Sequence, residues 1–80
     1  MATANISLDE NYVEVLNGPG FVSRFSGTVR LHIGPTAPST DTEDFHSLSR
    51  GAGSVTYTGT EKVFCRAQKS AASVVVTPTI

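Results

Sequence analysis

The feature that most constrains the fold of this chain is a set of short runs in which apolar and polar residues alternate. Every second residue of Val29–Ile33 is apolar, and Val63, Cys65 and Ala67 repeat this spacing later in the chain. Turn-forming Gly, Pro, Ser and Asp residues separate the runs. Because a period of two places alternate side chains on one face of a pleated strand, the sequence predicts an all-β domain.

The strand-like runs are short and closely spaced, with turns predicted at Asn17–Gly20 and Arg50–Gly53. Val74, Val75 and Val76 are three apolar residues in a row, which predicts a strand buried on both faces or an edge strand covered by a neighbour. Six or seven such strands predict a small antiparallel β-sandwich or barrel. The runs are 12–16, 21–25, 28–33, 45–48, 54–58, 62–67 and 72–77.

The chain has 80 residues, which is the size of one domain, and a domain this small has a thin core. Small domains commonly gain stability from disulfides, a bound metal or a partner subunit. Cys65 is the only cysteine, so an intrachain disulfide is excluded. We therefore expect a homo-oligomer, or a subunit that rests on a larger protein surface.

Charge and hydropathy exclude two classes of partner. The net charge is −1 and the six Lys and Arg residues are spread along the chain, so we expect no nucleic-acid partner. No apolar run approaches the roughly 18 residues of a membrane span, so we expect no membrane partner. Met1–Asn5 lacks the basic start and apolar centre of a signal peptide, which predicts synthesis in the cytosol.

Residues able to carry chemistry are present but not grouped as a site. Cys65 shares its predicted face with Val63 and Ala67, which favours core packing over pairing with His32 or His46 as a nucleophile. The acidic run Asp41–Asp44 matches no calcium loop, and the Gly-x-Gly fragments precede no helix. We therefore predict no enzyme activity, no catalytic residue, no metal and no cofactor.

Basic side chains are predicted to line up on two strands. Arg30 and His32 share one face of the first run, and Lys62 and Arg66 share one face of the other, with Phe64 between them. The interpretation we favour is a solvated outer face with one aromatic residue at a subunit contact. Binding of sugar or single-stranded nucleic acid is the alternative, because both ligands use basic and aromatic neighbours.

Four segments of residues 27–77 form a recognisable series of strands and turns. The series consists of a strand followed by Gly-x-x-Ala-Pro, a turn, a strand of the form Gly-Thr-x-Lys-apolar-aromatic-small-basic-Ala, and a valine-rich last strand. The segments are Thr28–Pro38, Leu48–Gly53, Gly59–Ala67 and Ser73–Thr77. In this series the chain resembles small virion proteins of tailed bacteriophages.

The resemblance implies a non-enzymatic subunit on the capsid surface of a virion. Proteins of this group include capsid decoration or cement proteins and the bases of head fibres or knobs, and they commonly form trimers. It therefore implies a homotrimer that binds the major capsid protein and stabilises the head. Residues 27–77 would form the β core, and residues 1–26 would supply N-terminal strands and a candidate attachment segment. Candidate contact residues are Tyr12, Phe21, Phe25, Phe64 and Val75, together with the loop Gly34–Asp44.

Two other functions remain open at this point. The first is a tail- or fibre-associated subunit of the virion, which the same resemblance covers. The second is a carbohydrate-binding module in which Tyr12, Tyr57 or Phe64 stacks on a sugar, although the chain has no Trp.

Overall fold

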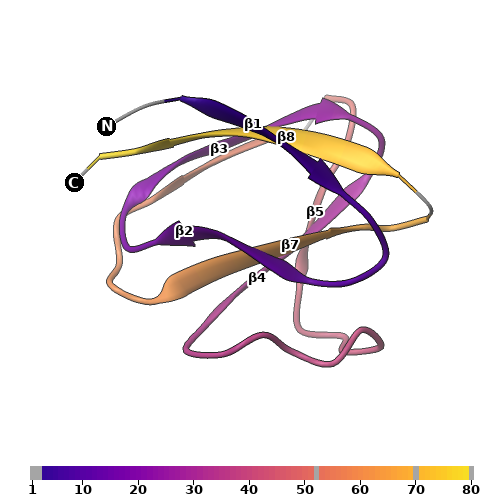
Figure 1. The fold of residues 1–80 in the computed structure, drawn as a ribbon, viewed down its shortest axis with the longest axis horizontal. Helices are drawn as coiled ribbons and strands as arrows, with labels where there is room; N and C mark the ends of the chain where they lie inside the picture. The colour runs from indigo at the N-terminus through magenta and orange to yellow at the C-terminus, as the bar shows by residue number, and fades with distance from the viewer. Residues whose placement is uncertain (1–2, 52, 70, 80) are drawn as a thin grey trace.

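The computed structural model describes residues 3–51, 53–69 and 71–79, and it is all-β as predicted. Its strands form two four-stranded antiparallel sheets (Figure 1). Sheet A has the order β1-β8-β3-β6, and sheet B has the order β2-β7-β4-β5. The eight strands are β1 (Ala4–Leu8), β2 (Val13–Asn17), β3 (Gly20–Ser26), β4 (Val29–Gly34), β5 (His46–Leu48), β6 (Ser54–Tyr57), β7 (Lys62–Ala67) and β8 (Ala72–Pro78).

The predicted number of strands was too low because β1 was not recognised. This strand lies at the edge of sheet A and pairs only with β8, where Ile6 is opposite Val74. Ala4 and Asn5 have low β-propensity, so their extended conformation depends on a partner that is about 70 residues away in the sequence.

Of the two alternatives predicted for Val74–Val76, burial on both faces or a covered edge strand, the edge strand is wrong. β8 lies between β1 and β3 and has a hydrogen-bonded neighbour on each side. Val74 and Val76 are buried in the core, whereas Val75 is half-buried on the opposite face. The apolar run therefore marks an inner strand whose second face is only partly covered.

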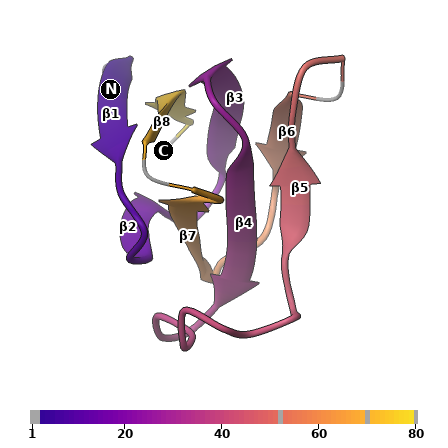
Figure 2. The same ribbon diagram turned by 90° about the vertical axis from the view of Figure 1, so that its right-hand side faces the viewer.

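The inner faces of the two sheets meet in one hydrophobic core. Figure 2 shows β1, β8, β3 and β6 along one side of the molecule, and β2, β7, β4 and β5 along the other. The alternation correctly predicted which residues of β4 and β7 point inward, since these residues lie in or against the core. The buried cluster contains Leu8, Val15, Leu16, Val22, Val29, Leu31, Leu48, Val63, Cys65, Ala67, Ala72, Val74 and Val76.

Strand β2 departs from simple alternation. Its register against β7 shifts between Glu14 and Leu16, so the adjacent residues Val15 and Leu16 are both buried. Val13, which the pattern grouped with Val15, is instead exposed. A β-bulge explains the adjacent buried pair, because it adds one residue between the paired positions. Val13 lies opposite the core residue Cys65, so its exposure comes from its place in the edge strand β2 and not from the bulge.

The N-terminal strands belong to both sheets. β1 and β3 flank β8 in sheet A, and β2 pairs with β7 in sheet B. The described part of residues 1–26 is thus built into the same core as residues 27–77. Whether this region also attaches the protein to another surface remains a prediction.

The turn between β3 and β4 requires glycine at position 27. Gly27 has a φ of +72°, a conformation that residues with a Cβ rarely adopt. A Cβ at this position would lie 2.8 Å from the carbonyl oxygen of Ala71 and 2.8 Å from the Cβ of Ala72. Gly51 also has a positive φ, of +93°, but its Cβ would meet nothing within 4 Å.

These two glycines give a matched test of local packing. We expect Gly27→Ala to lower the free energy of unfolding by about 3 kcal/mol, from backbone strain and the clash with Ala71. Gly51→Ala should cost about 1 kcal/mol, since it adds only backbone strain. Urea unfolding followed by circular dichroism measures both values. Equal losses in the two variants would contradict the packing assigned to this turn.

Candidate functional site

The outer face of sheet A carries no charged side chain among its described residues. The strand register places one set of alternate residues of β1, β8, β3 and β6 on this face, away from the core. Protein surfaces usually contain about a quarter to a third charged residues, so this composition is unusual. We call it the uncharged face; its residues are Asn5, Ser7, Phe21, Ser23, Ser26, Ser54, Thr56, Ser73, Val75 and Thr77.

Apolar side chains are exposed on and beside this face. Phe21 is 46% exposed and pairs with Thr77 and Thr56 in the neighbouring strands. Phe25 is 65% exposed and lies where the register of β3 shifts against β8. Val75 lies on the same face and is half-buried. Three of the five predicted contact residues thus lie in sheet A. Phe21 and Phe25 belong to β3, and Phe21 and Val75 lie on the outer face of the sheet.

Strand β1 gives sheet A an open edge next to the uncharged face. Natural edge strands commonly avoid further pairing by being short, by forming bulges or by carrying charges. β2 has a bulge and Glu14, and β5 is only three residues long. β1 has five residues, an unbroken register and no charged residue. Its backbone therefore offers hydrogen-bonding groups that another strand can use.

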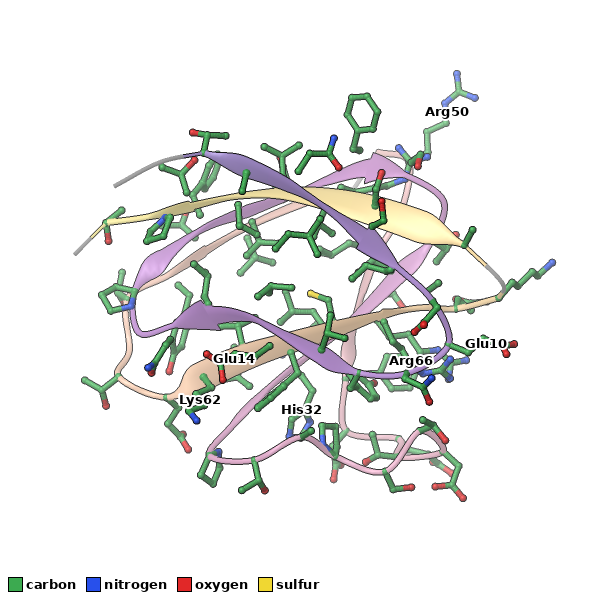
Figure 3. All side chains as sticks on the ribbon, in the orientation of Figure 1. Glu10, Glu14, His32, Arg50, Lys62 and Arg66 are labelled. Atoms are coloured by element: carbon green, nitrogen blue, oxygen red, sulfur yellow. The ribbon has the colours of Figure 1, made fainter. Side chains whose placement is uncertain are left out.

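The outer face of sheet B contains the predicted basic stripe. Arg30 of β4 lies directly opposite Arg66 of β7, and His32 lies opposite Phe64. Figure 3 shows His32, Arg66, Lys62 and Glu14 on this side of the molecule. Glu14 forms an ion pair with Lys62, with 3.5 Å between Oε1 and Nζ. The alignment of these side chains across the two strands is confirmed.

The expectation that this stripe is solvated was wrong at its centre. Arg66 is only 8% exposed and Phe64 only 5% exposed. Tyr12, which precedes β2, is also buried, and its ring centre lies 5.8 Å from the Arg66 guanidinium carbon. Tyr12 and Phe64, both predicted as contact residues, therefore pack within the chain and expose little surface to a partner.

The loop between β4 and β5 covers the other end of the stripe. His32 Nδ1–H donates a hydrogen bond to the carbonyl oxygen of Asp44, at 2.6 Å. The Phe45 ring lies 4.4 Å from the Arg30 guanidinium carbon, which is a cation–π contact. Most of the predicted contact loop Gly34–Asp44 is exposed, but its end is tied to sheet B. No local pattern in the sequence indicates these contacts, because they join residues from different elements.

The residues considered for chemistry are not assembled into a reactive centre. Cys65 is completely buried, and this burial raises the pKa of its thiol to about 12, so the thiol is protonated at neutral pH. It packs in the core, as the sequence predicted. Within the described ranges, no three His, Cys, Asp or Glu side chains gather where they could hold a metal ion. No described helix is long and apolar enough to cross a membrane.

Two shallow hollows border β5. The larger, of about 420 Å³, is lined by Ile33, Leu48 and Val55, by polar residues of β5 and β6, and by two glycines of the turn between these strands. The smaller, of about 360 Å³, lies between β4 and the β4–β5 loop, beside His32 and His46. The predicted sugar platforms line neither hollow: Tyr57 packs against the core, and its hydroxyl accepts a hydrogen bond from the Glu61 amide.

Comparison of the chain with protein-family models, curated proteins and solved structures finds no match. The geometry described above is therefore the basis for the functional argument, and the resemblance to bacteriophage virion proteins remains an expectation from the sequence.

Proposed function

We propose that this protein is a non-enzymatic assembly subunit that associates with copies of itself through sheet A. Its two sheets are taken as a β-sandwich, with the outer face of sheet A as the contact surface. The further proposal, which rests on the sequence resemblance, is that the assembly is a capsid decoration protein that binds the major capsid protein. It would then lie on the capsid surface of a bacteriophage virion after synthesis in the host cytoplasm.

The observation that carries the proposal is the uncharged face with its exposed aromatic side chains. Two copies that meet through this face bring no like charges together, so the contact has no electrostatic cost. Phe21 and Phe25 together supply the kind of aromatic anchors on which protein interfaces depend. The open edge of β1 adds backbone hydrogen bonds as a second means of association.

The mass of the protein in solution tests this proposal. We expect wild type to have an oligomeric mass in light scattering, with a trimer at three times the 8.4 kDa of one chain. The double variant Phe21→Lys and Phe25→Lys should be a monomer, because it places two positive charges on each contact surface. Its circular dichroism spectrum should be unchanged, since both side chains are exposed.

Val13→Lys is the matched control. Val13 is 38% exposed and belongs to sheet B, so the same substitution there should leave the oligomeric mass unchanged. A monomeric wild type, or a Phe21/Phe25 variant that keeps its mass, would contradict self-association through sheet A.

Binding to empty phage heads tests the second part. A decoration protein should bind in hundreds of copies per head, whereas the alternative, a tail- or fibre-associated subunit, should be found in a handful of copies per virion. A protein that assembles but does not bind heads or virions would contradict the phage assignment and leave self-association intact.

A further inference from the structure

Three buried side-chain atoms lack a hydrogen-bond partner within the described part of the chain, and all three belong to one cluster. They are Tyr12 Oη, Arg30 Nε and Arg66 Nε. Arg30 and Arg66 are direct cross-strand neighbours on the outer face of sheet B, and the Tyr12 ring lies beside the Arg66 guanidinium. We call these residues the arginine cluster. Buried polar atoms in native proteins nearly always have partners, so three unpaired atoms at one place require an explanation.

The charges of the arginine cluster are also uncompensated. Like charges directly opposite each other on neighbouring strands are destabilising. The one ion pair found among the described residues joins Lys62 to Glu14 and includes neither arginine. Arg66 Nη1–H donates a hydrogen bond to the carbonyl oxygen of Ala67, at 2.8 Å. Two arginines thus face each other across neighbouring strands, one buried and one half-buried, and neither forms an ion pair with a described carboxylate.

The surroundings of the cluster strengthen its attraction for an anion. Phe45 lies over Arg30, and Phe64 is the next outward-facing residue along β7 from Arg66. A charge in such an apolar setting interacts more strongly than the same charge in water. Arg30 is half-buried and Arg66 keeps 8% of its surface exposed, so part of each side chain meets solvent while the unpaired Nε atoms are buried.

We infer that the arginine cluster of Tyr12, Arg30 and Arg66 is a binding site for an oxyanion, meaning a carboxylate or a phosphate group. A guanidinium presents N–H donors in a planar fork that matches two oxygens of such a group. The unpaired Nε–H groups of both arginines and the Tyr12 hydroxyl would donate to it. The bound anion would accept hydrogen bonds from the unpaired atoms, and its negative charge would offset the two facing positive charges. Tyr12 completes the site, although the sequence pattern placed it outside the basic stripe.

Titration followed by NMR tests the inference on the atoms concerned. Sodium phosphate and sodium acetate are added separately at constant ionic strength, with sodium chloride as the reference salt. We expect saturable shifts of the Arg30 and Arg66 Nε–H resonances with phosphate, acetate or both. Arg24 is the internal control, because its Nε–H already donates to the carbonyl oxygen of Gly27 at 2.5 Å and should not respond. A response to acetate identifies a carboxylate ligand, and a response to phosphate alone identifies a phosphate ligand.

Substitution of one arginine by lysine separates specific binding from general attraction by charge. Arg66→Lys keeps the charge but removes the Nε–H and the planar fork, so it should weaken binding at least about tenfold. Arg50→Lys changes an exposed arginine of the β5–β6 turn, outside the arginine cluster, so this variant should bind the anion as wild type does. If Arg66→Lys does not fold, Arg30→Lys serves in its place. The inference is overturned if the Arg30 and Arg66 resonances follow the chloride reference, or if the lysine variant binds as tightly as wild type.

The inference does not depend on self-association through sheet A, because the arginine cluster lies on the opposite sheet. Loss of oligomer formation in the Phe21/Phe25 variant should leave the anion response intact. A failure of either proposal therefore leaves the other standing.

Discussion

Leu31→Ala should lower the free energy of unfolding by about 3–4 kcal/mol, the range measured when a buried leucine is truncated in a core that cannot collapse around the cavity. Leu31 is completely buried in β4, with Cys65 of β7 on one side and His46 of β5 on the other. An 80-residue domain has a total stability of about 4–12 kcal/mol, so this one change removes about a quarter or more of it. The core is thin, and the described residues form no second buried cluster that could compensate.

Val75→Ala is the control for Leu31→Ala. Val75 is half-buried on the outer face of sheet A, so its truncation should cost less than about 1 kcal/mol. Urea unfolding must be measured at one fixed protein concentration, because self-association makes apparent stability depend on concentration. If the two variants lose similar stability, then Leu31 is not the centre of a single shared core.

Local alternation was sufficient to predict the inward rows of β4 and β7. Each of these strands has a neighbour on both sides, so every inward residue meets the core and the period of two is preserved. In β2 the bulge breaks that period, and nothing in the sequence Val13-Glu14-Val15-Leu16 distinguishes a bulged strand from a regular one. β1 was missed for a different reason, because its conformation depends on pairing with β8 at the far end of the chain.

The candidate surfaces were predictable in part. The alignment of Arg30 with Arg66 followed from alternation in two strands, but their burial depends on Tyr12 and on the loop that carries Phe45. Those contacts are set by tertiary packing and have no local signal. The sequence contains a partial signal of the uncharged face, because Ser, Thr and Asn occupy its outward-facing polar positions in β1, β3, β6 and β8. Only the strand order shows that these positions form one surface.

The buried thiol of Cys65 should make the protein less stable in alkaline solution. Its pKa rises from 9.0 to about 12 on folding, because burial disfavours the thiolate. Above pH 9 the unfolded chain releases this proton while the folded chain keeps it, so the unfolded state binds fewer protons. Stability therefore falls with rising pH between the two pKa values and is unaffected by this group below them. At about pH 10.5 the loss amounts to roughly 2 kcal/mol.

Comparison of wild type with Cys65→Ala isolates this effect, because the other side chains that titrate in alkaline solution are present in both proteins. Tyr12 is present in both proteins, and its pKa is also raised, mainly by burial and to a smaller extent by Cys65, so only this smaller part differs in the variant. At neutral pH the alanine variant should be about 1 kcal/mol less stable, since it loses the packing of one sulfur atom. That difference should shrink as the pH rises, reverse in sign at about pH 9.7, and favour the alanine variant by about 1 kcal/mol at about pH 10.5, because alanine has no proton to release. The difference in unfolding free energy between wild type and variant could also stay constant from pH 7 to about 10.5. That result would mean that the Cys65 thiol has the same pKa in the folded and the unfolded chain. Cys65 would then have to be in contact with water in the folded protein, which its position between Val13 and Leu31 in sheet B argues against.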